Sequence, residues 1–131
     1  MTGDPIKVLF IDDTADTAHL YSRIIDAQAD MRSVGTLSSA DDLIVEAKRL
    51  RPDITVIDLV MPGRNPLDAL RELSDVLPES RAIVFSGHDD PRTVDAALSA
   101  GAWGLVSKGD DVSAVLRAIR RVARGEVCFP G

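Results

Sequence analysis

Five side chains suited to phosphate chemistry follow the apolar runs of this sequence. Four such runs lead directly into reactive polar residues, which are Asp12 and Asp13, Asp58, Ser86 and Lys108. The stretches between the runs have helical spacing, so the chain alternates strand and helix, and its strands should pair in parallel. The carboxyl ends of parallel strands gather at one edge of a sheet, where ligands bind. We therefore expect three carboxylates, a hydroxyl and an ammonium to meet in one cleft.

The carboxylates determine what this cleft can bind. Asp12, Asp13 and Asp58 would repel one another, so a positive charge is needed close by. Mg²⁺ fits, because it is commonly held by one or two carboxylates together with water. Lys108 adds an ammonium suited to a phosphoryl oxygen, and Ser86 adds a hydroxyl that can donate to another. The set is what in-line phosphoryl transfer to a carboxylate nucleophile requires.

The composition indicates one ordinary globular domain. The 131 residues are 45% hydrophobic and 27% charged, enough to bury a core without crosslinks. No apolar run approaches the roughly 20 residues that span a bilayer, so no membrane association is expected. Residues 1–5 lack the basic and apolar parts of a signal peptide. The single cysteine, Cys128, fits a reducing compartment, and the predicted location is the cytoplasm.

The net charge argues against direct binding of nucleic acid by this chain. It is −6, whereas phosphate backbones are held by clustered Lys and Arg. One basic group lies on the last predicted helix and consists of Arg117, Arg120, Arg121 and Arg124. We interpret it as a solvated helix face that balances an acidic protein.

The periodicity predicts five strand–helix units, which pack as a three-layer α/β sandwich. Strands are expected at residues 6–11, 31–36 (at an edge), 53–58, 81–86 and 102–107. The first helix is expected at residues 15–28, and the second opens with a capping-box variant, Ser39 and Asp42. Asn65-Pro66 and Asp90-Pro91 read as N-caps followed by proline, and Asp110 or Asp111 caps the last helix. The fourth helix should turn Val94, Ala97 and Leu98 inward and stop at Gly101.

These motifs resemble the receiver domain of two-component response regulators. The resemblance covers nearly the whole chain and is carried by residues 8–13, 58–63, 85–87 and 99–104 leading to Lys108. It implies a flavodoxin-like (βα)5 fold, with a parallel five-stranded sheet in the order 2-1-3-4-5. This agrees with the architecture that the periodicity predicts.

The resemblance also implies a role for each site residue. Asp58 would accept a phosphoryl group from a phosphohistidine of a sensor histidine kinase. Asp13, Asp58 and the backbone carbonyl of Val60 would ligate Mg²⁺ or Mn²⁺, and Asp12 would act largely through water. Lys108 would contact the phosphoryl group, and Ser86 would be the switch hydroxyl. Such a protein is not a turnover enzyme, although it assists its own phosphorylation and dephosphorylation.

The end of the chain is similar to the NarL/LuxR subfamily, in which a helix-turn-helix DNA-binding domain follows the receiver. No proline follows Lys108, and residues 118–126 fit that subfamily. We divide the chain into a receiver domain, residues 1–124, and the start of a linker, residues 125–131, with the output domain outside this chain. It is either a piece of a transcription factor or a lone receiver acting through protein contacts, and we favour the first. A homodimer formed on phosphorylation stays open.

Three residues depart from the family pattern or leave two interpretations. Leu105 stands where the family usually has Tyr or Phe, so a rotating aromatic ring cannot be the switch. Signal transmission should then depend on Ser86 and the loop of residues 86–90. We interpret His88 as an exposed loop histidine. Trp103 is either an anchor for a partner or half-buried at the start of a strand.

Three other functions compete with the receiver. A pseudo-receiver, an interaction module that needs no phosphorylation, usually lacks an acidic residue or the lysine, and all five are present here. A haloacid-dehalogenase-type phosphatase requires two aspartates separated by one residue, whereas Asp12 and Asp13 are adjacent. A flavodoxin-type FMN carrier needs hydroxyls and amides in its first loop, where these aspartates would repel the phosphate.

Overall fold

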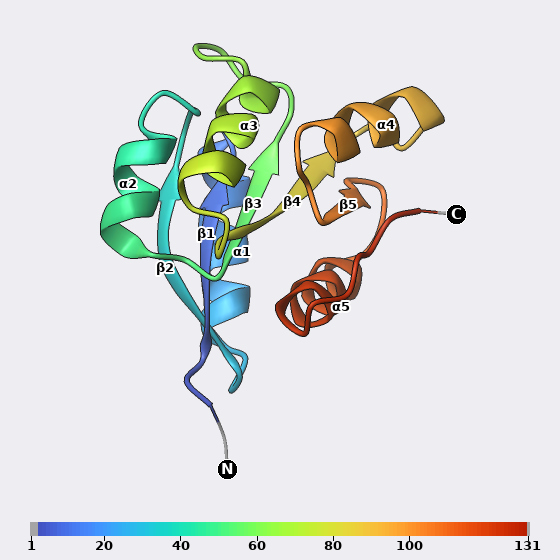
Figure 1. Cartoon of the computed structure of the whole chain (residues 1–131). Helices are drawn as coiled ribbons and strands as arrows, with labels where there is room; N and C mark the ends of the chain where they lie inside the picture. The colour runs from blue at the N-terminus through green and yellow to red at the C-terminus, as the bar shows by residue number, and fades with distance from the viewer. Residues whose placement is uncertain (1–2, 131) are drawn as a thin grey trace.

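A parallel five-stranded sheet in the order β2-β1-β3-β4-β5 forms the centre of the molecule (Figure 1). The computed structural model describes residues 3–130. The strands are β1 (Ile6–Ile11), β2 (Met31–Leu37), β3 (Ile54–Asp58), β4 (Arg81–Ser86) and β5 (Gly104–Ser107). The helices are α1 (Ala15–Asp26), α2 (Leu43–Leu50), α3 (Pro66–Val76), α4 (Pro91–Ser99) and α5 (Val112–Ala123). The expected (βα)5 fold and strand order are confirmed, with β2 at an edge.

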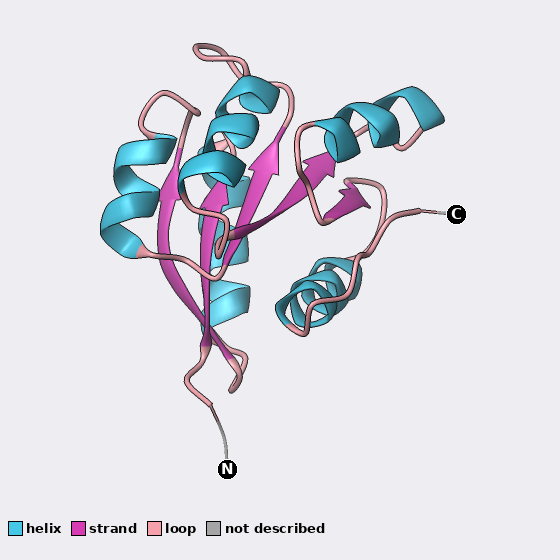
Figure 2. Cartoon of the chain, in the orientation of Figure 1, coloured by secondary structure: helices cyan, strands magenta, loops and turns pink. Residues whose placement is uncertain are grey.

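Helices cover both faces of the sheet, which explains why the strands are continuously apolar (Figure 2). Side chains alternate along β1: Leu9 and Ile11 are buried in one cluster with residues of α2, α3 and α4. Val8 and Phe10 are buried in the other, with residues of α1 and α5. Within residues 3–130, no helix combines the length and the apolar character that a membrane crossing requires.

Two of the predicted N-caps are confirmed by their hydrogen bonds. The Asn65 side-chain oxygen accepts from the backbone N–H groups of Leu67 (2.9 Å) and Asp68 (3.3 Å), and Pro66 begins α3. Of the two candidates for α5, Asp111 is the cap, and its carboxylate accepts from the Ala114 N–H. Asp90 does precede α4, but its carboxylate accepts from the Thr93 hydroxyl instead of a backbone N–H.

The capping box predicted before α2 is wrong. The helix begins at Leu43, and its N-cap residue Asp42 makes no side-chain hydrogen bond to the backbone. The Ser39 hydroxyl instead accepts from the N–H of Asp41, two residues later, at 3.3 Å. A local turn has thus taken the hydroxyl that a capping box would need.

Other corrections concern the ends of elements. Helix α1 ends at Asp26, two residues earlier than expected, where the Gln28 N–H turns to the Ile25 carbonyl. Strand β5 starts two residues late because the Ala102 N–H bonds to the carbonyl of Ala97 and closes the end of α4. That closure uses Gly101 at a φ of +95°.

Smaller corrections remain at β3 and α4. Strand β3 starts at Ile54 because the Asp53 carboxylate accepts from the Lys7 N–H. Leu98 is not inward-facing but 48% exposed, and Val94 is partly buried beside the fully buried Ala97. Of the seven-residue linker prediction, Gly131 lies outside the described residues, as do Met1 and Thr2 of the segment tested for a signal peptide.

The cap of α3 provides a test of the fold close to the predicted site. Replacing Asn65 with Ala leaves two N–H groups of the first turn without an acceptor, so the free energy of unfolding should fall by about 1 kcal/mol. Asn65→Asp keeps an acceptor oxygen and should stay within about 0.5 kcal/mol of the parent. Urea unfolding followed by circular dichroism measures both, and an unchanged midpoint in Asn65→Ala would contradict this role of the cap.

Candidate functional site

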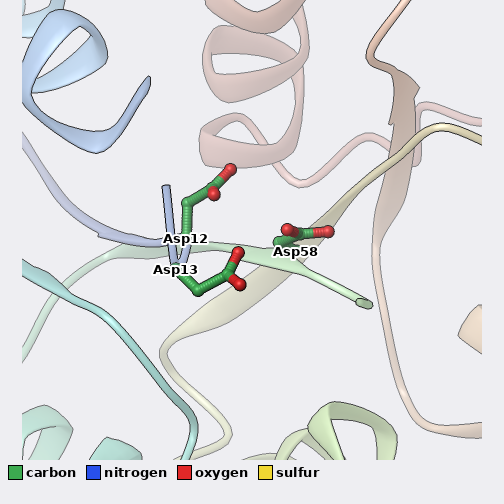
Figure 3. A group of neighbouring side chains, drawn as sticks. All are labelled: Asp12, Asp13 and Asp58. Carbon is green, nitrogen blue, oxygen red and sulfur yellow. The ribbon is translucent and has the colours of Figure 1, made fainter. Parts of the chain in front are cut away.

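The three predicted carboxylates meet between the ends of β1 and β3 (Figure 3). One oxygen from each of Asp12, Asp13 and Asp58 lies within 4.8 Å of the others. Asp12 and Asp58 are almost fully buried, at 1% and 2% exposure, whereas Asp13 is exposed. The arrangement follows from the register, because β1 and β3 pair in parallel up to Ile11 and Ile57, immediately before the acids.

Lys108 supplies the positive charge opposite the two buried acids. Its ammonium lies 3.0 Å from Asp58 Oδ2 and 3.5 Å from Asp12 Oδ2. The backbone fixes its place, since the Lys108 N–H donates to the carbonyl of Ser86 at 2.7 Å. Burial by itself would lower the pKa of Lys108, but the hydrogen bond and the charge of Asp58, with a smaller contribution from Asp12, outweigh it and raise that pKa.

Asp58 is held at both of its carboxylate oxygens. Oδ1 accepts from the N–H of Val60 at 3.1 Å, in a turn between neighbours in sequence, and Oδ2 accepts from Lys108. The carboxylate therefore has a fixed orientation at the end of a buried strand. Val60 lies in the loop after β3, two residues beyond Asp58, and is 69% exposed.

Asp12 has one oxygen whose hydrogen-bonding capacity is unused. Oδ1 accepts from the Thr14 N–H at 2.9 Å, but the buried Oδ2 has no hydrogen-bond partner among the described residues. A buried carboxylate oxygen without a donor is costly unless a cation neutralises it. Together with the short distances to Asp13 and Asp58, this oxygen makes the site suitable for a hard divalent cation such as Mg²⁺.

Ser86 lies at the end of β4, beside the strands that carry the other site residues. It is buried, and its hydroxyl accepts from the N–H of His88 at 3.0 Å. The predicted switch hydroxyl is therefore engaged with its own loop. His88 is exposed, as the sequence predicted.

Sequence reasoning missed an aromatic floor beneath the site. The rings of Phe10, Tyr21 and Phe85 contact one another, with centroids 4.9 to 5.8 Å apart. The Lys108 ammonium lies 5.5 Å from the centre of the Phe85 ring, within the range of a cation–π attraction. The sequence did offer one signal for this aromatic floor, since Phe10 and Phe85 stand just before the polar ends of their strands.

A clamp on the loop after Asp58 was also missed. Asp41, from the loop before α2, accepts from the N–H of Arg64 at 2.7 Å. A Cβ at Gly63, whose φ is +90°, would lie 2.7 Å from the same oxygen. Arg64 in turn pairs with Glu72 of α3 at 2.6 Å. The loop between β3 and α3 is thus held from two sides, by Asp41 and by Glu72.

Comparisons with known proteins identify the family of the chain. The model of the response regulator receiver domain family matches residues 8–120. The uncharacterized transcriptional regulatory protein YxjL of Bacillus subtilis is 30% identical over 129 residues, which are 98% of this chain and 59% of that protein. Response regulator protein VraR of Staphylococcus aureus is 29% identical and covers 95% of this chain and 59% of its own length. The chain thus spans about three fifths of these relatives.

Solved structures match over nearly the whole chain. A LuxR-family two-component response regulator from Aurantimonas sp. SI85-9A1 has a TM-score of 0.90 at 25% identity, covering 96% of this chain and 90% of that one. The signal receiver domain of the putative response regulator NarL from Mycobacterium tuberculosis has a TM-score of 0.88 at 22% identity. It covers 95% of this chain and 100% of its own.

Removing the Lys108 charge tests the electrostatics of the site. Because the pKa of Lys108 is raised, its stabilising charge is fully present below the ordinary lysine pKa of about 10.4 and is lost only as pH rises through the higher value. At neutral pH, Lys108→Met should lower the free energy of unfolding by about 1–2 kcal/mol. That is less than the roughly 3–5 kcal/mol of a fully buried pair, because the lysine side chain is 36% exposed.

Mg²⁺ should restore part of this loss, since a cation bound to the folded state stabilises it. Lys48→Met, on the exposed face of α2, is the matched control and should change little. Thermal unfolding with and without Mg²⁺ measures each effect. Equal stability of Lys108→Met and Lys48→Met in metal-free buffer would contradict this description.

Proposed function

Because the chain belongs to the response regulator receiver domain family, we propose that it accepts a phosphoryl group on Asp58 from a phosphohistidine of a sensor histidine kinase. The observation that carries the proposal is the burial of Asp58 and the fixed orientation of its carboxylate. It is a buried carboxylate whose two oxygens are oriented by Val60 and Lys108, beside two further carboxylates. A structural aspartate at a strand end would need neither the lysine nor the other two acids.

Transfer is an in-line displacement. An oxygen of Asp58 attacks the phosphorus while the P–N bond of the phosphohistidine breaks, and the electron pair returns to the imidazole nitrogen of the kinase. Lys108, already 3.0 Å from the carboxylate, then pairs with a phosphoryl oxygen and offsets its negative charge. Positioning and charge neutralisation of this kind are the main requirements of phosphoryl transfer.

The metal site of this proposal consists of Asp13, Asp58 and the backbone carbonyl of Val60, with Asp12 acting largely through water. The buried Oδ2 of Asp12, which accepts no hydrogen bond from the described residues and has only the Lys108 ammonium 3.5 Å away, supports it, as does the closeness of the three carboxylates. When bound, Mg²⁺ or Mn²⁺ would neutralise charge on the phosphoryl oxygens. Asp12 and Asp13 then serve to hold the cation and its water shell beside Asp58.

Receiver domains are signalling modules and generally not enzymes. The phosphorylated Asp58 would therefore act by changing the conformation of the domain. In our proposal the Ser86 hydroxyl turns to the phosphoryl group and the loop of residues 86–90 changes shape. The output would be a helix-turn-helix domain that regulates transcription in the cytoplasm, outside this chain. The transcriptional regulator among the relatives and the LuxR-family structural neighbour support that output.

The acceptor is tested by intact-protein mass after incubation with Mg²⁺ and acetyl phosphate. A single phosphoryl adduct should form, should need Mg²⁺, and should be absent from Asp58→Asn. Asp53→Asn is a matched control, since Asp53 immediately precedes the first residue of β3, at the end opposite Asp58, and its carboxylate accepts only from the Lys7 N–H. No adduct on the folded parent with either acetyl phosphate or a phosphorylated kinase would favour the phosphorylation-independent pseudo-receiver.

The switch is tested by hydrogen exchange at the loop after β4. In the free protein the His88 N–H is bonded to the Ser86 hydroxyl, so it should exchange slowly. Phosphorylation or beryllofluoride should withdraw that acceptor and speed the exchange at His88. In Ser86→Ala the amide should exchange fast in both states while the phosphoryl adduct still forms. Identical exchange of residues 86–90 with and without beryllofluoride would overturn the switch.

A further inference from the structure

Residues 126–130, called here the closing segment, run back along the outer edge of β5 after helix α5 (Figure 1). The Cys128 N–H donates to the carbonyl of Trp103, and the Cys128 carbonyl accepts from the Leu105 N–H, both at 3.0 Å. These two bonds make a parallel bridge between Cys128 and Gly104. The segment predicted to be the start of a linker therefore extends the sheet by one residue pair.

The sequence of β5 leaves room for this contact. A Cβ at Gly104 would lie 2.9 Å from the carbonyl oxygen of Cys128, closer than real Cβ atoms approach. Any larger residue at position 104 would push the closing segment away. The absence of a side chain at Gly104 thus lets the backbone of the closing segment approach β5.

Side chains of the closing segment pack against both faces of the sheet at this edge. Phe129 packs against the cluster that contains Leu105, while Cys128 packs against the opposite cluster, beside the half-buried Trp103. Glu126 is paired with Arg121 (3.3 Å) and Arg124 (3.0 Å), which fixes the turn at the end of α5. The Trp103 ring is covered by the Arg81 guanidinium, whose carbon lies 4.4 Å from the ring centroid. Of the two interpretations of Trp103, the structure therefore supports the half-buried residue at the start of a strand.

The closing segment also borders the part of the molecule that the proposed switch would move. Phe129 and Pro130 line a cavity of about 380 Å³ together with Leu105 and Asp89. Asp89 belongs to the loop that the Ser86 hydroxyl holds through His88, and Leu105 precedes Lys108 by three residues. Both segments that would respond to phosphorylation therefore line the same cavity as Phe129.

We propose that the closing segment is a latch, docked on β5 in the unphosphorylated protein and released when Asp58 is phosphorylated. The inference rests on the proposed phosphorylation of Asp58. When Ser86 turns to the phosphoryl group, the loop loses the bond that holds His88, Asp89 shifts, and the cavity around Phe129 changes shape. The segment is held by two backbone hydrogen bonds to β5, two exposed ion pairs of Glu126 and the partly buried side chains of Cys128 and Phe129. So few buried contacts place it in the less stable part of the structure, where a small free energy can shift the equilibrium. The segment would thereby carry the state of the site to the end of α5.

Cys128, the single cysteine of the chain, reports directly on the latch. It is partly buried when the segment is docked, so a thiol reagent such as dithionitrobenzoate should react slowly with the unmodified protein. After phosphorylation with acetyl phosphate and Mg²⁺, the rate should rise about fivefold or more, the lower end of typical allosteric coupling. Intact mass measured on the same samples gives the phosphorylated fraction.

Two variants should open the latch without phosphorylation. Phe129→Ala removes the ring that packs against the cluster containing Leu105, and Gly104→Ala places a methyl group against the Cys128 carbonyl. Both should raise the thiol rate to that of the phosphorylated parent and abolish the further rise on phosphorylation. Val127→Ala is the matched control: its side chain is 58% exposed in the same segment, and it should behave as the parent.

The outcomes separate the latch from the phosphoacceptor assignment. A phosphoryl adduct with an unchanged thiol rate would overturn the latch and leave the function of Asp58 intact. The latch is likewise overturned if Phe129→Ala, which does not touch the sheet backbone, reacts no faster than Val127→Ala. Absence of any adduct would overturn the phosphoacceptor assignment, and the latch with it.

Discussion

Three carboxylates brought to one edge of a parallel sheet create a repulsion that the rest of the site must offset. The strands cannot separate Asp12 from Asp58, because β1 and β3 pair in register up to the preceding residues. Lys108 offsets the charge of the two buried acids, and Asp13 is exposed to solvent. One buried oxygen of Asp12 still lacks a donor among the residues that the structure describes. A divalent cation and a phosphoryl group can complete such an arrangement of charges.

Much of this was readable from the sequence because the deciding contacts are local or follow from topology. Apolar runs mark the strands, helical spacing marks the crossovers, and parallel pairing then places every strand end at one edge. The closeness of Asp12, Asp13 and Asp58, with Lys108 in the same cleft, needed no further information. The cap at Asn65 was likewise visible, and the cap of α5 was narrowed to Asp110 or Asp111, since such caps bond to N–H groups two or three residues away.

What the sequence did not reveal depends on contacts between residues far apart in the chain. The clamp from Asp41 to Arg64 joins two loops, and nothing in the neighbourhood of Asp41 indicates its partner. The capping box at Ser39 failed because its hydroxyl had a nearer donor. Strand β5 lost its expected start because Ala102 closes the preceding helix, where a glycine stop and a strand start compete for the same residue. The only sequence signal for the pairing of Cys128 with β5 was Gly104. Why a glycine is needed there becomes clear only in the structure, where a Cβ would collide with the Cys128 carbonyl.

The short contact between Cys128 and β5 also bears on how the molecule behaves toward its neighbours in solution. An outer strand offers unpaired N–H and C=O groups, and these are a template on which another polypeptide can add a strand. Here the closing segment occupies the peptide groups flanking Gly104. Release of the segment would leave these peptide groups of β5 unpaired and would expose apolar surface at Leu105. The five residues would therefore protect this edge against self-association, and chains that lose them would be expected to aggregate more readily while the acidic site stays unaltered.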